Sequence, residues 1–155
     1  MNRFLVILNC LLVSRAICLG KTTETTIGKG EKGIKSKIDF SSIQGSWQGV
    51  SLEVAGRSAP KEFAEKGKYI FGKEIVIFYQ GSEKLSQAKF IIDVSQDPEH
   101  IDLIGMTERE KGKKQLGIYK IENNILTLCI SNKRPQKFKS GKTTGLAKFK
   151  RIKNK

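Results

Sequence analysis

The chain is a series of short segments in which apolar and polar residues alternate, the pattern of β-strands that bury one face. The first segment runs from Trp47 to Val54 and places Val50, Leu52 and Val54 on one face. This pattern predicts eight strands, over residues 47–54, 69–71, 74–79, 88–94, 100–105, 115–122, 125–131 and 146–152.

Turn residues separate these segments. Gly72-Lys73 predicts a tight hairpin, and Asn123-Asn124 predicts a second one because asparagine tolerates the left-handed backbone that favoured two-residue turns require. Between Pro60 and Gly67 the early proline, the acidic first turn and the final glycine predict one short helix after the first strand.

Sequential strands joined by tight turns predict an all-β protein with antiparallel neighbours. Eight strands can close into a small up-and-down barrel, which removes the exposed sheet edges. A two-sheet sandwich is the alternative architecture. The interior of the barrel is predicted to hold large apolar side chains: Phe71, Ile75, Ile77, Tyr79, Phe90, Ile92, Leu126, Leu128 and Phe149.

Gly45-Ser46-Trp47 at the start of the first strand, together with a cationic last strand, resembles the lipocalin (calycin) pattern. In that family the tryptophan closes one end of the barrel and packs beneath an arginine from the final strand. The resemblance implies that Gly45, Trp47 and Arg151 form a structural closure here, with Lys150 as the alternative cationic partner.

Further blocks extend this resemblance to a family of small lipocalin-like domains, uncharacterised and abundant in planctomycete bacteria. It covers about residues 41 to 151 and implies a fold without implying an activity. The matching blocks are Ile43–Trp47, Val50–Val54, Ile101–Leu103, Gly117–Ile121, Ile125–Cys129 and Arg134-Pro135 with Phe138.

The first 20 residues are typical of a cleaved signal peptide, with charged Arg3, an apolar run from Phe4 to Val13 and small residues near Gly20. The sequence therefore predicts a secreted or periplasmic protein without a transmembrane segment in the mature chain. A lipidated Cys18 and an uncleaved anchor are alternatives that the large Ile17 and the short apolar run disfavour.

Residues 21–40 are predicted to be a disordered basic linker, because threonine, glycine and lysine leave too few apolar residues to offset the entropy of ordering. The barrel domain then spans residues 41–152, and residues 153–155 form a basic tail. We expect a monomer.

The chain carries 29 Lys and Arg residues against 15 Asp and Glu residues, a formal charge of +14. No acid occurs after Asn132. This distribution predicts a polyanion patch that would bind an acidic polysaccharide or an anionic envelope surface, and secretion argues against nucleic acid. The patch residues are Lys137, Lys139, Lys142, Lys148 and Lys150.

Candidate chemistry is sparse. The chain has one histidine, His100, which lies among turn carboxylates that surface chemistry explains better than a metal site does. The strand carboxylates Glu53, Asp93 and Asp102 are predicted to face solvent, and Cys129 to be a buried small hydrophobe. We therefore predict no catalytic residues, no metal and no cofactor.

The long connection between residues 130 and 146 contains Arg134, Pro135 and Phe138, and it is predicted to place Phe138 as a lid over a barrel end.

Three functions remain open. The first is binding of a small apolar ligand inside the barrel, and the second is binding of an acidic polymer at the basic C-terminal end. The weakest is hydrolysis by carboxylates at the barrel mouth.

Overall fold

The structure is a computed structural model that describes residues 40–153. The predicted signal peptide, the basic linker up to residue 39 and residues 154–155 lie outside the described residues. The elements in chain order are η1 (Phe40–Ser42), β1 (Gly45–Val54), β2 (Arg57–Ser58), α2 (Lys61–Lys66), β3 (Gly67–Phe71), β4 (Ile75–Gln80), β5 (Glu83–Asp93), β6 (His100–Gly105), β7 (Lys114–Glu122), β8 (Ile125–Ser131) and β9 (Gly145–Arg151).

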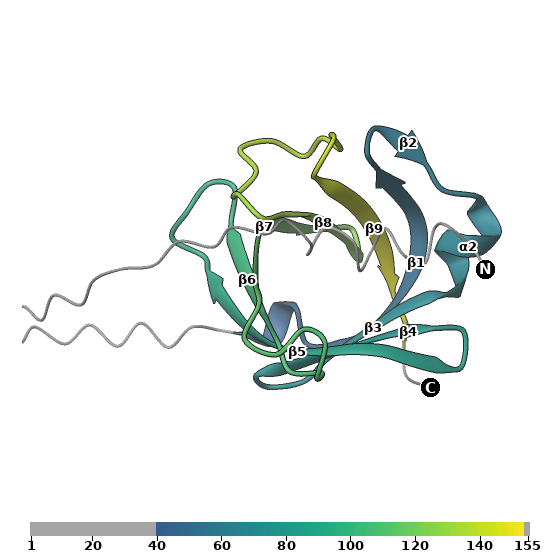
Figure 1. Ribbon diagram of the computed structural model, residues 1–155, viewed down its shortest axis with the longest axis horizontal. Helices are drawn as coiled ribbons and strands as arrows, with labels where there is room; N and C mark the ends of the chain where they lie inside the picture. The colour runs from purple at the N-terminus through teal and green to yellow at the C-terminus, as the bar shows by residue number, and fades with distance from the viewer. Residues whose placement is uncertain (1–39, 154–155) are drawn as a thin grey trace, which may run out of the picture.

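The strands form one antiparallel sheet that closes on itself. The order is β1-β3-β4-β5-β6-β7-β8-β9, and β9 pairs again with β1. Figure 1 shows these strands as a ring, with α2 on its outside beside β1. Among residues 40–153, the two-residue strand β2 pairs only with the end of β1 and takes no part in closure. The prediction of a closed eight-stranded β-barrel with one short helix is confirmed.

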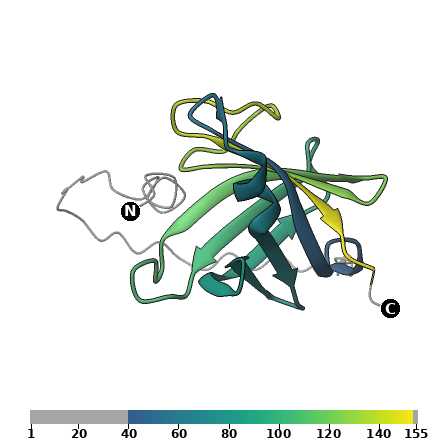
Figure 2. The same ribbon diagram turned by 90° about the vertical axis from the view of Figure 1, so that its right-hand side faces the viewer.

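The helix α2 packs against β1 at the point where β1 extends beyond its pairing with β3. Gln48 is the last residue of β1 that pairs with β3, and its side-chain amide donates a hydrogen bond of 3.0 Å to the carbonyl of Gly67. Gly49 lies so close to the helix that a Cβ there would be 2.0 Å from the carbonyl oxygen of Ala64. The glycine therefore lets α2 pack against the barrel wall (Figure 2).

Both predicted tight turns are present, one of them shifted. Asn123 and Asn124 have φ angles of 51° and 62°, as the turn between β7 and β8 requires. In the β3–β4 hairpin, the amide of Gly72 donates to the carbonyl of Ile75 at 2.8 Å, so Lys73 and Glu74 form the turn. The turn thus lies one residue later than the sequence predicted.

The prediction of which residues of β4 point into the barrel was wrong. Val76 and Phe78 are buried in the interior, whereas Ile75 is 37% exposed and alternates outward with Ile77 and Tyr79. Both faces of this strand are apolar, so alternation alone could not assign them. Cross-strand pairing decides the matter, because Val76 lies opposite the buried Phe71.

Two further differences concern β1 and β5. A bulge between Gly49 and Ser51 turns Val50 outward, where it is 43% exposed. The strand β5 begins at Glu83, five residues before the predicted start, because its polar first half gives no apolar alternation and is held by pairing with β4.

Candidate functional site

One end of the barrel is closed by Trp47, whose side chain is fully buried. Its indole nitrogen donates a hydrogen bond of 2.8 Å to the carbonyl of Ile43. The guanidinium carbon of Arg151 lies 4.1 Å from the Trp47 ring centroid, and Arg151 also donates to the carbonyls of Gln44, at 2.7 Å, and Ser42. The structure thus brings together the tryptophan and the arginine that the resemblance paired.

Gly45 belongs to the same closure. Its φ angle is 114°, and a Cβ there would lie 3.3 Å from the Arg151 guanidinium. A side chain at this position would be strained and would crowd the arginine. Lys150, the alternative partner, is exposed on the opposite face of β9.

The connection between β8 and β9 folds onto the outer wall of the barrel, so the prediction that it covers a barrel end was wrong. Cys129 is fully buried beneath it, with its sulfur 3.6 Å from the carbonyl oxygens of Lys137 and Lys139. Arg134 donates to the carbonyl of Gly117 at 2.6 Å. Phe138 lies on this outer wall as well, with the Lys120 ammonium 5.6 Å from its ring centroid.

Polar contacts explain this placement. Asp102 projects outward from β6 and accepts hydrogen bonds from Arg134 and from Lys114, the latter at 2.8 Å. Burial opposes ionisation of the Asp102 carboxyl, but the hydrogen bonds and charges of the two cations outweigh it and lower the pKa. Ser140 further donates to the Glu53 carboxylate at 3.0 Å. Pro135 lies in the same connection and is half-buried.

The predicted polyanion residues lie on the outer surface. Lys148 and Lys150 flank the buried Phe149 on β9 and are exposed, as are Lys137, Lys139 and Lys142 on the preceding connection. Within residues 40–153, none of these five lysines forms a salt bridge.

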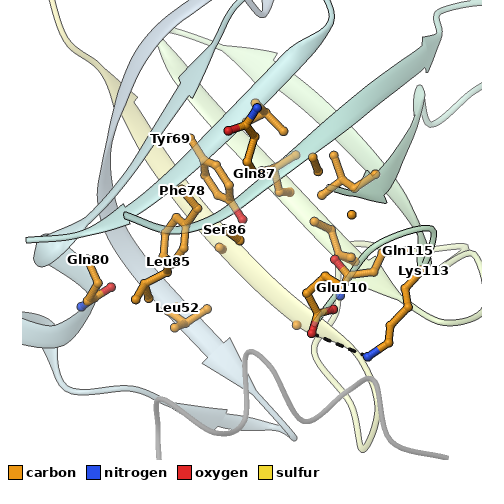
Figure 3. A pocket seen from close by; sticks show the side chains of 18 of the residues that line it. Leu52, Tyr69, Phe78, Gln80, Leu85, Ser86, Gln87, Glu110, Lys113 and Gln115 are labelled. Atoms are coloured by element: carbon orange, nitrogen blue, oxygen red, sulfur yellow. Dashed lines mark ion pairs between the residues drawn. The ribbon is translucent and has the colours of Figure 1, made fainter. Parts of the chain in front are cut away.

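The opposite end of the barrel contains a pocket of about 110 Å³. Every one of the eight barrel strands contributes to its lining, so the pocket lies inside the barrel (Figure 3). Its apolar wall consists of Leu52, Phe63, Tyr69, Val76, Phe78, Leu85, Ala88, Leu103, Leu128, Ile130 and Ala147.

Tyr69 is the polar group on this apolar wall. Its ring packs 4.8 Å from Phe78 and 4.9 Å from Phe149, centroid to centroid. Its hydroxyl points into the pocket (Figure 3), and burial raises its pKa to about 12. At neutral pH the pocket therefore holds a neutral phenol that can donate and accept hydrogen bonds.

The polar rim of the pocket, which was not predicted from the sequence, includes Glu110, Lys113 and Gln115. The first two lie in the polar connection between β6 and β7, where no periodicity marks an inward position. In the sequence, the glycine at the end of the predicted strand, Gly105, was the available signal for a close approach of the next segment. In the structure, a Cβ at Gly105 would lie 2.1 Å from the Glu110 carbonyl oxygen. The glycine permits the connection to fold inward over the mouth.

The fold and the pocket define a lipocalin-like β-barrel that is closed at one end and hollow at the other. In comparisons with protein-family models, curated proteins and solved structures, nothing matches this chain. In residues 40–153, no three His, Cys, Asp or Glu side chains are placed to hold a metal ion. The described helices are also too short and polar to cross a bilayer.

The first prediction concerns the closed end. Replacing Trp47 with alanine should lower the free energy of unfolding by about 3 to 5 kcal/mol, the usual cost of truncating a buried aromatic side chain. Urea unfolding measures this. The matched control is Val50→Ala on the outer wall, which should change stability by less than about 1 kcal/mol. An unchanged unfolding midpoint in Trp47→Ala would contradict the assignment.

The second prediction concerns Asp102. Because folding lowers its pKa, its contribution to stability is complete above the unfolded pKa, about 3.9, and is lost as pH falls through the folded value. Asp102→Asn should therefore flatten the decline in unfolding free energy below about pH 4. Urea unfolding across this range tests it. Parallel curves for the wild type and the variant would show that Asp102 carries no such linkage.

Proposed function

We propose that this protein binds a small apolar molecule in the pocket at the open end of the barrel. The observation that carries this proposal is the pocket itself, which lies within the ring of eight strands and has an apolar wall and a polar rim. Filling such a wall with a ligand removes apolar surface from water, and rim groups then orient the ligand.

The size of the pocket limits the ligand. Its volume of about 110 Å³ is close to the roughly 150 Å³ of an engineered cavity that holds benzene, and below the roughly 300 to 1,000 Å³ of sites for drug-sized molecules. The ligand is therefore one ring or a short alkyl chain, with any polar group at the mouth. So few buried atoms give an affinity in the micromolar to millimolar range.

We also infer that the chain is a secreted member of the lipocalin-like family that it resembles. The leader of residues 1–20 supports secretion. The contact between Trp47 and Arg151 supports the family, because it joins the first barrel strand to the last in the way that the resemblance implies.

Hydrolysis gains no support from the geometry of the carboxylates named for it. Glu53 and Asp102 make contacts on the outer wall, with Ser140 and Arg134 respectively, and neither lines the pocket. Asp93 accepts hydrogen bonds from Ser95 in the turn after β5. We therefore propose binding without catalysis.

A second candidate function is binding of an acidic polysaccharide on the outer face of β9. It is favoured by the unpaired lysines of that face. Lys148 lies opposite Ser51 and Thr127, and Lys150 opposite Gln48 and Ile125, so no acid stands directly across from either lysine. Their charges remain available to an anionic polymer.

The ligand proposal predicts that filling the pocket abolishes binding. Ala147 lines the pocket between Leu52 and Leu128. Ala147→Phe should remove the amide NMR shifts that benzyl alcohol causes in the wild type. The control, Val50→Phe, adds the same ring on the outer wall and should leave the shifts in place. Equal shifts in both variants would place the ligand elsewhere.

The polymer proposal predicts a loss of binding when charge is removed from β9. The double variant Lys148→Gln, Lys150→Gln should weaken binding to heparin and reduce its dependence on salt, because fewer counterions are released. The matched control is Lys73→Gln, Lys111→Gln, which removes two exposed lysines elsewhere. Equal weakening in both pairs would mean that only net charge matters and no patch exists.

A further inference from the structure

Two charged residues lie at the pocket mouth, and the acidic Glu110 is less exposed than the basic Lys113 beside it. The Glu110 side chain is 15% exposed and that of Lys113 is 41% exposed, and their charged groups are 3.7 Å apart. Both residues line the pocket, and Figure 3 shows the pair at its rim. The inner charge of this site is therefore negative, although the chain as a whole carries +14.

The backbone holds Glu110 in this position. The amide of Gly105 donates to the carbonyl of Lys113 at 2.9 Å, and the amide of Gly112 donates back to Gly105 at the same distance. The amide of Glu110 itself donates to the carbonyl of Thr107 at 2.8 Å. These bonds fold the β6–β7 connection into a turn, so the backbone that carries Glu110 is held at the pocket mouth before any ligand arrives.

The Glu110 carboxylate also retains capacity to accept hydrogen bonds. Its separation of 3.7 Å from the Lys113 nitrogen exceeds hydrogen-bond length, so the ion pair with Lys113 leaves the carboxylate oxygens able to accept a hydrogen bond. A partly desolvated carboxylate in this state favours a charged donor over a neutral one, and it repels another anion.

Resting on the proposed binding function, we propose that the pocket selects a small primary amine with an apolar body. The apolar body occupies the wall around Leu128 and Phe78, and the ammonium group donates to Glu110 at the mouth. Lys113 competes for the same carboxylate from the solvent side. It is too exposed to serve as the main anchor for an anionic ligand.

The test uses three probes that share a phenyl ring and a two-carbon spacer: phenethylamine, phenethyl alcohol and hydrocinnamate. Calorimetric titration of the full chain at neutral pH should give tightest binding for the amine, by about tenfold over the alcohol, the size of one charge-assisted hydrogen bond. Hydrocinnamate should bind most weakly.

Two variants assign the preference to the proposed residues. Glu110→Gln should bring the amine-to-alcohol affinity ratio close to one, and Lys113→Met should raise that ratio by releasing the carboxylate. The ratio is measured within each variant, so a change in stability does not mimic the effect. If Glu110→Gln does not fold, the amine-to-alcohol affinity ratio of Lys113→Met alone tests the proposal.

The outcomes separate the two proposals. If the alcohol binds but the amine binds no tighter, or if hydrocinnamate binds tightest, the amine preference is overturned and the pocket function stands. An amine preference that persists in Glu110→Gln or fails to rise in Lys113→Met also overturns it. If none of the three probes binds the folded wild-type chain, the proposed function fails and takes this inference with it.

Discussion

The pairing of β1 with β9 closes the sheet into a barrel and thereby creates its interior. Without it the sheet would have two long edges and an exposed apolar face, whereas closure satisfies the edge hydrogen bonds and creates an interior. Arg151 over the buried Trp47 ring adds an attraction of about 0.5 to 2 kcal/mol to this seam. The contact lies where the first and last barrel strands meet.

Closure also makes the two ends of the barrel different. The Trp47 end is filled by large side chains such as Phe90 and Tyr119, both almost fully buried. At the other end, smaller residues such as Ala147 and Ala88 leave the interior unfilled, and the β6–β7 connection brings polar groups to the rim. A single core of limited volume thus fills one end of the barrel and leaves an apolar pocket at the other.

Much of the fold could be predicted from the sequence because its signals are local. Asn123-Asn124 specifies its turn, and the resemblance around Trp47 indicated its contact with Arg151. The faces of β4 could not be assigned, since the strand is apolar on both sides and only its pairing with β3 decides. The rim acid Glu110 was hidden for another reason, because loops have no periodicity and its position depends on close approach to Gly105.

The filled end of the barrel and the proposed binding pocket at the other end can be distinguished on a single strand, β8. Leu126 and Leu128 both project from β8 into the interior of the barrel. Only Leu128 lines the pocket, and Leu126 is fully buried toward the closed end. Intermolecular NOEs from bound benzyl alcohol should therefore reach the methyl groups of Leu128 and be absent at Leu126. NOEs to Leu126, or to neither leucine when benzyl alcohol is bound, would show that the ligand does not occupy this pocket.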